Sequence, residues 1–127
     1  MENMGHPTVM IVDDDQDLLQ LMKTTLQREG FLVDARSEPP NWIELNEAHP
    51  AMIFMDVDLQ HANGARACKA IKENFNNGGL PIILISGHGQ DQLRNEAKVS
   101  HADGFLSKPF ARHMLVELAE RHARNAA

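Results

Sequence analysis

Five short, mostly apolar runs divide the chain, and amphipathic segments lie between them. The runs are residues 8–12, 31–35, 52–55, 81–85 and 104–107. Continuous apolar runs of this length are typical of strands that are buried on both faces of a parallel sheet. We therefore expect five strands in one sheet.

The segments between the runs repeat apolar residues every three or four positions, which is the spacing of a helix with one buried face. This spacing occurs over residues 18–26, 42–48, 67–75, 91–100 and 114–119, and it is weakest over 91–100. Gly30 and the stretch 76–79 mark breaks. Strand and helix thus alternate five times, which predicts an α/β fold. Since no repeat or linker is visible, we expect one domain over residues 1–127, with its core at about 8–123.

Polar side chains follow four of the five predicted strands. Asp13 and Asp14 follow the first, Asp56 the third, Ser86 the fourth and Lys108 the fifth. Because parallel strands end at the same edge of a sheet, these side chains should meet in one shallow cleft. The second strand contributes no such residue, as expected of a strand at the margin.

Three carboxylates at one edge repel one another unless a cation lies between them. Their oxygens suit Mg²⁺, which keeps several waters and binds few carboxylates. Asp56 could then attack phosphorus as a nucleophile, while Lys108 and Ser86 contact other phosphoryl oxygens. The set favours phosphoryl transfer over hydride, acyl or glycosyl chemistry.

Each of these residues also has a purely structural interpretation. Residues 13–17 could be a helix-capping cluster, and Asp56 a turn residue at a strand end. The Ser86-Gly87 pair alone is an ordinary turn. The ordered occurrence of all of them at strand ends favours the functional interpretation.

The composition indicates which compartment and which partners to expect. The formal net charge of −6 argues against general affinity for nucleic acid. A single cysteine, Cys68, rules out an internal disulfide and is consistent with a reducing compartment. No apolar run reaches the roughly 20 residues of a membrane span, and Met1–Pro7 lacks the pattern of a secretory leader. We expect a cytoplasmic protein with no membrane and no direct nucleic-acid partner.

The motifs resemble the receiver domains of bacterial two-component response regulators, from Thr8 to about Ala123. The matching pieces are Ile11-Val12-Asp13-Asp14-Asp15, the strand ending in Asp56, Asn63-Gly64, the run into Ser86-Gly87, and Phe105-Leu106-Ser107-Lys108-Pro109-Phe110. The resemblance implies a doubly wound (βα)5 domain with the flavodoxin-like strand order 2-1-3-4-5.

It also implies the roles of the site residues. Asp56 resembles the phosphoacceptor, and Asp13 and Asp14 resemble the acidic pair that organises Mg²⁺, with Asp14 as the direct ligand. The backbone carbonyl of Asp58 would complete the metal site. Ser86 and Lys108 resemble the residues that sense the phosphoryl group.

Further positions match other features of the family. Phe105 occupies the place of the aromatic switch, which acts with Ser86, and Pro109 follows Lys108 in what is typically a cis peptide bond. Asp58 and His88 lie two positions after the phosphoacceptor and the hydroxyl residue, and we hypothesise that they tune the phosphoryl lifetime. The alternative is that both are solvated loop residues with no effect on that lifetime.

One departure concerns the loop after the phosphoacceptor. Where many members have Met-Pro, this chain has Leu59-Gln60, so we expect a more mobile loop over 58–63. The Asn63-Gly64 pair should still form a turn.

The implied partners are a sensor histidine kinase or a histidine phosphotransfer protein, together with an unidentified downstream protein. The expected output surface includes Leu93–Val99, Phe105, His113 and Glu117. The basic residues near the C-terminus, Arg121, His122 and Arg124, are interpreted as a solvated helix end that complements the helix dipole.

Two other functions are weighed. Asp56-Val57-Asp58 resembles the first motif of haloacid-dehalogenase-type phosphohydrolases, but the double-aspartate strand comes first here rather than last. The domain could also be an interaction module that is never phosphorylated. Two possibilities remain open, a stand-alone regulator or phosphorelay intermediate, which we favour, and a fragment of a longer protein.

Overall fold

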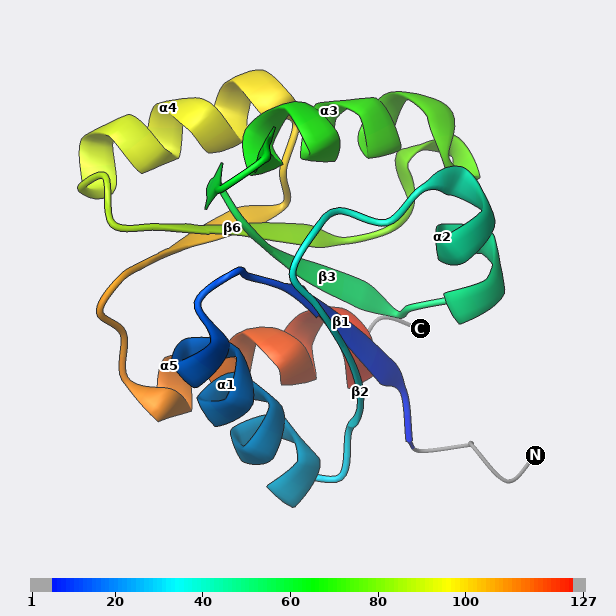
Figure 1. Ribbon diagram of the computed structural model, residues 1–127, viewed down its shortest axis with the longest axis vertical. Helices are drawn as coiled ribbons and strands as arrows, with labels where there is room; N and C mark the ends of the chain where they lie inside the picture. Colours follow the sequence, from blue (N-terminus) through cyan, green and yellow to red (C-terminus); the bar gives the residue numbers. More distant parts are fainter. Residues whose placement is uncertain (1–5, 125–127) are drawn as a thin grey trace.

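The computed structural model describes residues 6–124, in which a five-stranded parallel sheet lies between two layers of helices (Figure 1). The strands run in the order β2-β1-β3-β6-β7, so the predicted order of the five main strands is confirmed. Their bounds are β1 Thr8–Val12, β2 Leu32–Arg36, β3 Met52–Asp56, β6 Ile82–Ser86 and β7 Gly104–Ser107.

All five predicted helices are present, with ends that shift by up to a few residues. They are α1 Gln16–Arg28, α2 Trp42–Ala48, α3 Gly64–Asn74, α4 Gln90–Ser100 and α5 Arg112–Ala119. A short 3₁₀ turn, η1 Asn76–Gly78, follows α3, and a π-helical turn, η2 Glu120–Arg124, extends α5. Sequence periodicity predicted neither of these turns.

The sheet is buried on both faces because side chains alternate along each strand. In β1, Val9 and Ile11 join the core under α1 and α5, whereas Met10 and Val12 join the core under α2, α3 and α4. Figure 1 shows the same division, with α3 and α4 above the sheet and α1 and α5 below it. Apolar residues therefore occupy both faces, which leaves the strand ends for polar side chains.

The segment after β3 differs from the predicted loop. Asp58–Leu59 (β4) and Ala62–Asn63 (β5) form a small antiparallel pair. Asn63 caps α3 by accepting the Arg66 backbone N–H, so Asn63-Gly64 starts a helix rather than forming a free turn. The sequence pattern missed this hairpin because each strand has only two residues.

Gly64 is required at this point by a close approach between two backbones. A Cβ atom placed on it would lie 1.9 Å from the carbonyl oxygen of Asp56. Any larger residue would therefore push β3 and α3 apart beside the predicted phosphoacceptor.

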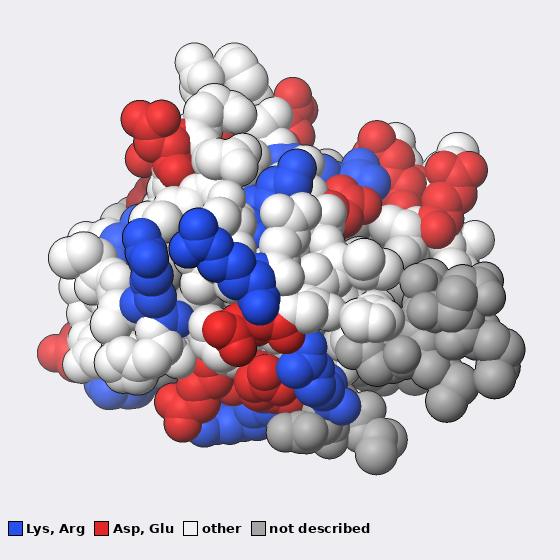
Figure 2. All heavy atoms as spheres, turned by 90° about the horizontal axis from the view of Figure 1, so that it is seen from below, with Lys and Arg blue, Asp and Glu red and all other residues white. Residues whose placement is uncertain are grey.

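The basic end of the chain is only partly solvated. Arg124 lies over the Phe31 ring, 4.2 Å from its centre, and donates to the carbonyl of Glu29 at the end of α1. It thus complements the C-terminus of α1, whereas the sequence suggested only the end of its own helix. Figure 2 shows acidic and basic side chains interspersed over the face that carries α1.

No helix within residues 6–124 combines the length and apolar character needed to cross a membrane. The prediction about a leader in Met1–Pro7 falls mostly on residues 1–5, which lie outside the described part, as do residues 125–127 at the other end of the predicted domain.

Candidate functional site

The predicted site residues meet at the carboxyl edge of the sheet. Asp56 ends β3, Ser86 ends β6, Asp13 follows β1 and Lys108 follows β7. Since β1, β3, β6 and β7 are consecutive neighbours, these positions lie side by side. Carboxylate oxygens of Asp13, Asp14 and Asp56 all lie within 4.8 Å of one another. The expected convergence is therefore found.

One lysine serves two buried carboxylates. The Lys108 Nζ atom lies 3.1 Å from Asp13 Oδ2 and 3.3 Å from Asp56 Oδ1. Asp13 is fully buried, and its other oxygen, Oδ1, accepts the backbone N–H of Asp15 at 2.9 Å. Among the described residues, Asp13 Oδ2 has the ion pair but no partner with hydrogen-bond geometry. The cluster carries more negative than positive charge.

The electrostatics of Asp56 reflect this excess. Burial and the charge of Asp13 raise its pKa to about 6, while Lys108 and a backbone hydrogen bond from Asp58 act in the opposite direction. Burial alone would lower the pKa of Lys108, but Asp13 and Asp56 outweigh it and raise the pKa. Asp56 is thus mostly ionised at neutral pH, although its surroundings stabilise the charged form less than water does.

These oxygens suit a small divalent cation. Asp13 Oδ2 is buried and lacks a hydrogen bond from the described residues, and Asp14 and Asp56 present further oxygens beside it. Oxygen ligands with room for water are what Mg²⁺ requires. Asp14 is held in place by the backbone N–H of Gln60, which donates to its Oδ2. This contact between residues 46 positions apart has no signal in the sequence.

The acidic residues after β1 include both a helix cap and members of the candidate site. Asp15 is the N-cap of α1, accepting backbone N–H groups of Asp17 and Leu18. Asp13 and Asp14 instead contribute to the carboxylate cluster. Capping and site chemistry therefore fall to different residues of one run.

Ser86 and Phe105 lie where the resemblance implied, with distinct surroundings. Ser86 is buried, and its hydroxyl accepts the backbone N–H of His88 at 3.0 Å. Phe105 is half-buried under the Arg94 guanidinium, which lies 5.5 Å from the ring centre. The Lys108–Pro109 bond is cis, as the resemblance implied. Leu93, expected on the output surface, is instead buried in the core because it faces the sheet.

His88 and Asp58 form an ion pair through His88 Nε2. The other ring nitrogen, Nδ1, lies 3.1 Å from Glu96 Oε1 and 3.2 Å from Gln92 Nε2. The Glu96 hydrogen bond is the largest cause of a raised His88 pKa; burial opposes it and Asp58 adds to it. Glu96 and Gln92 were not predicted as site residues, because their contact with His88 depends on how α4 is placed.

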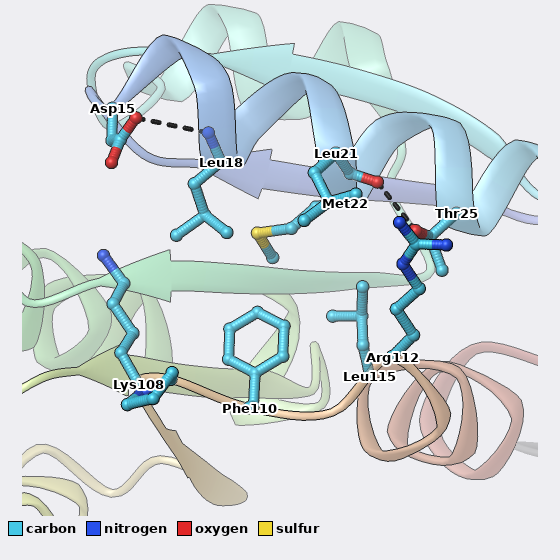
Figure 3. A pocket seen from close by; sticks show the side chains of 10 residues that line it. Asp15, Leu18, Leu21, Met22, Thr25, Lys108, Phe110, Arg112 and Leu115 are labelled. Carbon is cyan, nitrogen blue, oxygen red and sulfur yellow. Dashed lines mark hydrogen bonds between the residues drawn. The ribbon is translucent and has the colours of Figure 1, made fainter.

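An apolar pocket of about 470 Å³ adjoins the site between α1 and the segment after β7. Figure 3 shows Leu18 and Met22 of α1 facing Phe110 and Leu115, with Lys108 at one end. Lys108 is the link between this pocket and the carboxylate cluster. The pocket was not predicted, since apolar helix residues usually indicate only core.

Known proteins resemble this chain in sequence. The family described as response regulator receiver domain matches residues 9–120. The phosphate regulon transcriptional regulatory protein PhoB of Rhizobium meliloti is 28% identical, over 94% of this chain and 53% of that protein. Protein PilG of Pseudomonas aeruginosa is 27% identical, over 90% of this chain and 85% of its own length. The chain spans about half or less of the first curated relatives that it matches.

Solved structures agree on the fold. A putative response regulator from Chloroflexus aurantiacus has a TM-score of 0.86 and 22% identity, covering 94% of this chain and 99% of that one. The chemotaxis protein CheY4 of Vibrio cholerae has a TM-score of 0.81 and 25% identity, covering 92% and 98%. With the family match over most of its length, this chain belongs to the response regulator receiver domains.

Proposed function

We propose that this receiver domain accepts a phosphoryl group on Asp56, with Mg²⁺, from the phosphohistidine of a sensor kinase or phosphotransfer protein in the cytoplasm. The observation that carries the proposal is the buried cluster of Asp13, Asp56 and Lys108, in which one ammonium faces two carboxylates and Asp13 Oδ2 has no hydrogen bond from the described residues. Buried charge that is not fully paired costs stability, and such clusters are concentrated at functional sites.

The reaction is a displacement at phosphorus. A carboxylate oxygen of ionised Asp56 forms the new P–O bond while the P–N bond of phosphohistidine breaks. The imidazole nitrogen keeps the electron pair of that bond and takes up a proton from solvent. Because the pKa of Asp56 is about 6, the nucleophile is mostly ionised at neutral pH.

The neighbouring side chains bind the incoming group. Lys108 is positioned to pair with a phosphoryl oxygen, and the Ser86 hydroxyl with another once it moves toward the phosphate. Bound Mg²⁺, held by Asp13, Asp14, Asp56 and the Asp58 carbonyl, would neutralise phosphoryl charge.

The output would be a shift between two arrangements of α4, β7 and α5. Phe105 on β7 is the proposed switch, and its ring is half-buried under the Arg94 guanidinium. Exposed residues of this surface include Val99, His113 and Glu117, which would face the downstream protein.

The test is incubation with Mg²⁺ and acetyl phosphate, followed by intact mass measurement. The wild type should gain one phosphoryl group, and Asp56→Ala should gain none. Asp91→Ala, which removes a fully exposed carboxylate on α4, is the matched control and should label normally. An unlabelled wild type would favour the interaction-module alternative, and repeated turnover of a phosphate monoester would favour the phosphohydrolase.

A further inference from the structure

The His88 imidazole bridges two elements beside the phosphoacceptor. It lies in the segment between β6 and α4, yet its Nε2 pairs with Asp58, which follows β3. Since β3 and β6 are neighbours, with Asp56 opposite Ile85, this bridge spans the strand ends next to Asp56. Its Nδ1 is engaged by Glu96 at 3.1 Å, so both ring nitrogens are occupied.

The backbone around His88 does little to fix the ring. Gly87 and Gly89 flank it, both with open space where a Cβ would be, and Gly89 has a φ of +93°. Glycine on either side permits a wide range of backbone conformations. The position of the imidazole therefore depends on the contacts of its own ring.

Glu96 is the better-placed of the two carboxylates to hold that ring. It projects from the middle of α4, and its side chain is 21% exposed, against 58% for Asp58. A partly buried carboxylate on a regular helix has fewer alternative positions than an exposed one on a two-residue strand.

We infer that Glu96 is a positioning residue that lengthens the life of the aspartyl phosphate by holding His88 against Asp58; this rests on the proposed function. Hydrolysis requires a water oxygen to attack phosphorus while the bond from phosphorus to Asp56 breaks, returning the carboxylate and releasing inorganic phosphate and a proton. The bridge from His88 to Asp58 lies at the strand ends beside Asp56, where a held ring limits the approach of that water. Without Glu96 the ring loses a partner on α4 and can move away from Asp58.

The contact between Glu96 and His88 connects the phosphoryl lifetime to the output surface. Glu96 lies on α4, the helix that the proposed switch would shift. A downstream protein that displaces α4 would therefore also move His88 and change how long the signal lasts.

The experiment follows the decay of acetyl-phosphate-labelled protein by intact mass, in Mg²⁺ buffer after removal of the donor. Glu96→Ala should shorten the half-life about threefold or more, in the range that coupled neighbours show. Glu96→Gln, whose side-chain oxygen still accepts the Nδ1 hydrogen, should remain close to wild type. Asp91→Ala on the same helix should leave the half-life unchanged.

A double-mutant cycle separates positioning from a general effect on α4. In a His88→Ala background, adding Glu96→Ala should have no further effect. An unchanged or longer half-life in Glu96→Ala, or the same shortening without His88, overturns the inference while leaving the proposed function intact. Failure of the wild type to label would overturn both.

A measurement without phosphate covers the case in which Glu96→Ala fails to fold. In the unphosphorylated wild type, the NMR signal of His88 Nδ1 should report a hydrogen bond, and Glu96→Gln should shift it. The absence of any shift would show that Glu96 does not hold the ring, and would also overturn the inference.

Discussion

Two lysine–carboxylate clusters lie at opposite edges of the same sheet, and they are built differently. At the carboxyl edge, Lys108 faces both Asp13 and Asp56, at 3.1 and 3.3 Å. At the amino edge, Lys72 of α3 pairs with a single carboxylate, Asp103, at 2.7 Å.

In the amino-edge cluster, both charged groups also make hydrogen bonds to the backbone. Lys72 Nζ also donates to the carbonyl of Leu80, and Asp103 Oδ2 also accepts the backbone N–H of Ile82. This joins α3 to the starts of β6 and β7. The carboxyl-edge cluster instead contains Asp13 Oδ2, the one buried side-chain oxygen or nitrogen within residues 6–124 that lacks a hydrogen bond. The difference indicates that the amino edge joins structural elements, whereas the carboxyl edge keeps a buried oxygen without a hydrogen bond, as functional sites often do.

The largest expected effect comes from breaking the satisfied cluster. Asp103→Ala leaves the Lys72 ammonium, whose side chain is 9% exposed, without its carboxylate and removes the acceptor for the Ile82 N–H. We expect the free energy of unfolding to fall by about 2 kcal/mol, below the range for a fully buried pair because Asp103 is exposed. Urea unfolding measures this.

The control replaces a carboxylate that is not part of either cluster. Asp91→Ala on α4 removes an exposed group and should change stability by less than about 0.5 kcal/mol. If Asp103→Ala changed the free energy of unfolding equally little, the amino-edge cluster would be no more than a surface ion pair, and the contrast between the two edges would be wrong.

The opposite sign is expected at the carboxyl edge. Because burial and Asp13 raise the pKa of Asp56 to about 6 from its ordinary value of 3.8, ionised Asp56 weakens the metal-free fold. Asp56→Asn in EDTA at pH 7.5 should raise the free energy of unfolding by about 1–2 kcal/mol, because the neutral amide removes the penalty of the buried charge. Urea unfolding of both proteins provides the measurement.

The pH dependence of the stabilisation by Asp56→Asn shows whether it comes from charge or from packing. The penalty from ionised Asp56 is complete above the folded pKa of about 6, shrinks as the pH falls, and is absent below about 3.8, where both states are protonated. The gain from Asp56→Asn should therefore disappear by about pH 4. A gain that persisted there would point to packing rather than charge.

The sequence predicted the carboxyl edge much better than the amino edge. Asp13, Asp56, Ser86 and Lys108 each end or follow an apolar strand, so the parallel topology alone brings them together. Lys72 lies within a helical segment, and its pairing with a residue 31 positions away depends on how α3 packs.

Contacts between separately packed elements account for most of the site residues that were not predicted. Glu96 reaches His88 from α4, and the Gln60 N–H reaches Asp14 from the turn between two short strands. Gly64 was identified only as a turn residue, although its real constraint is the backbone of Asp56. Strand ends can be predicted from apolar runs, but side-chain reach between separately packed elements cannot.

Mg²⁺ should stabilise the protein through the carboxylates of the carboxyl edge. Mg²⁺ at about ten times its dissociation constant should stabilise the wild type by about 1.4 kcal/mol, seen as a rise in Tm. Asp13→Asn should lose most of that response, because it removes a carboxylate of the cluster. The Lys69→Met variant, which alters an exposed lysine of α3, should retain it in full. An equal response in Asp13→Asn would place the cation elsewhere.

The smallest expected effect belongs to His122, in the turn that extends α5. Burial lowers its pKa, with Asp103 acting in the opposite direction and Arg121 and Lys72 adding to the decrease. A lowered folded pKa means that the unfolded chain binds the proton first, so stability falls as the pH drops below about 6.5 toward the folded value. His122→Gln should flatten this part of the stability profile, and NMR titration of Asp103→Asn should show a still lower His122 pKa. Were the His122 pKa unchanged in Asp103→Asn, the electrostatic influence of the amino-edge cluster would stop short of α5, and its role would be confined to joining α3 to the two strands.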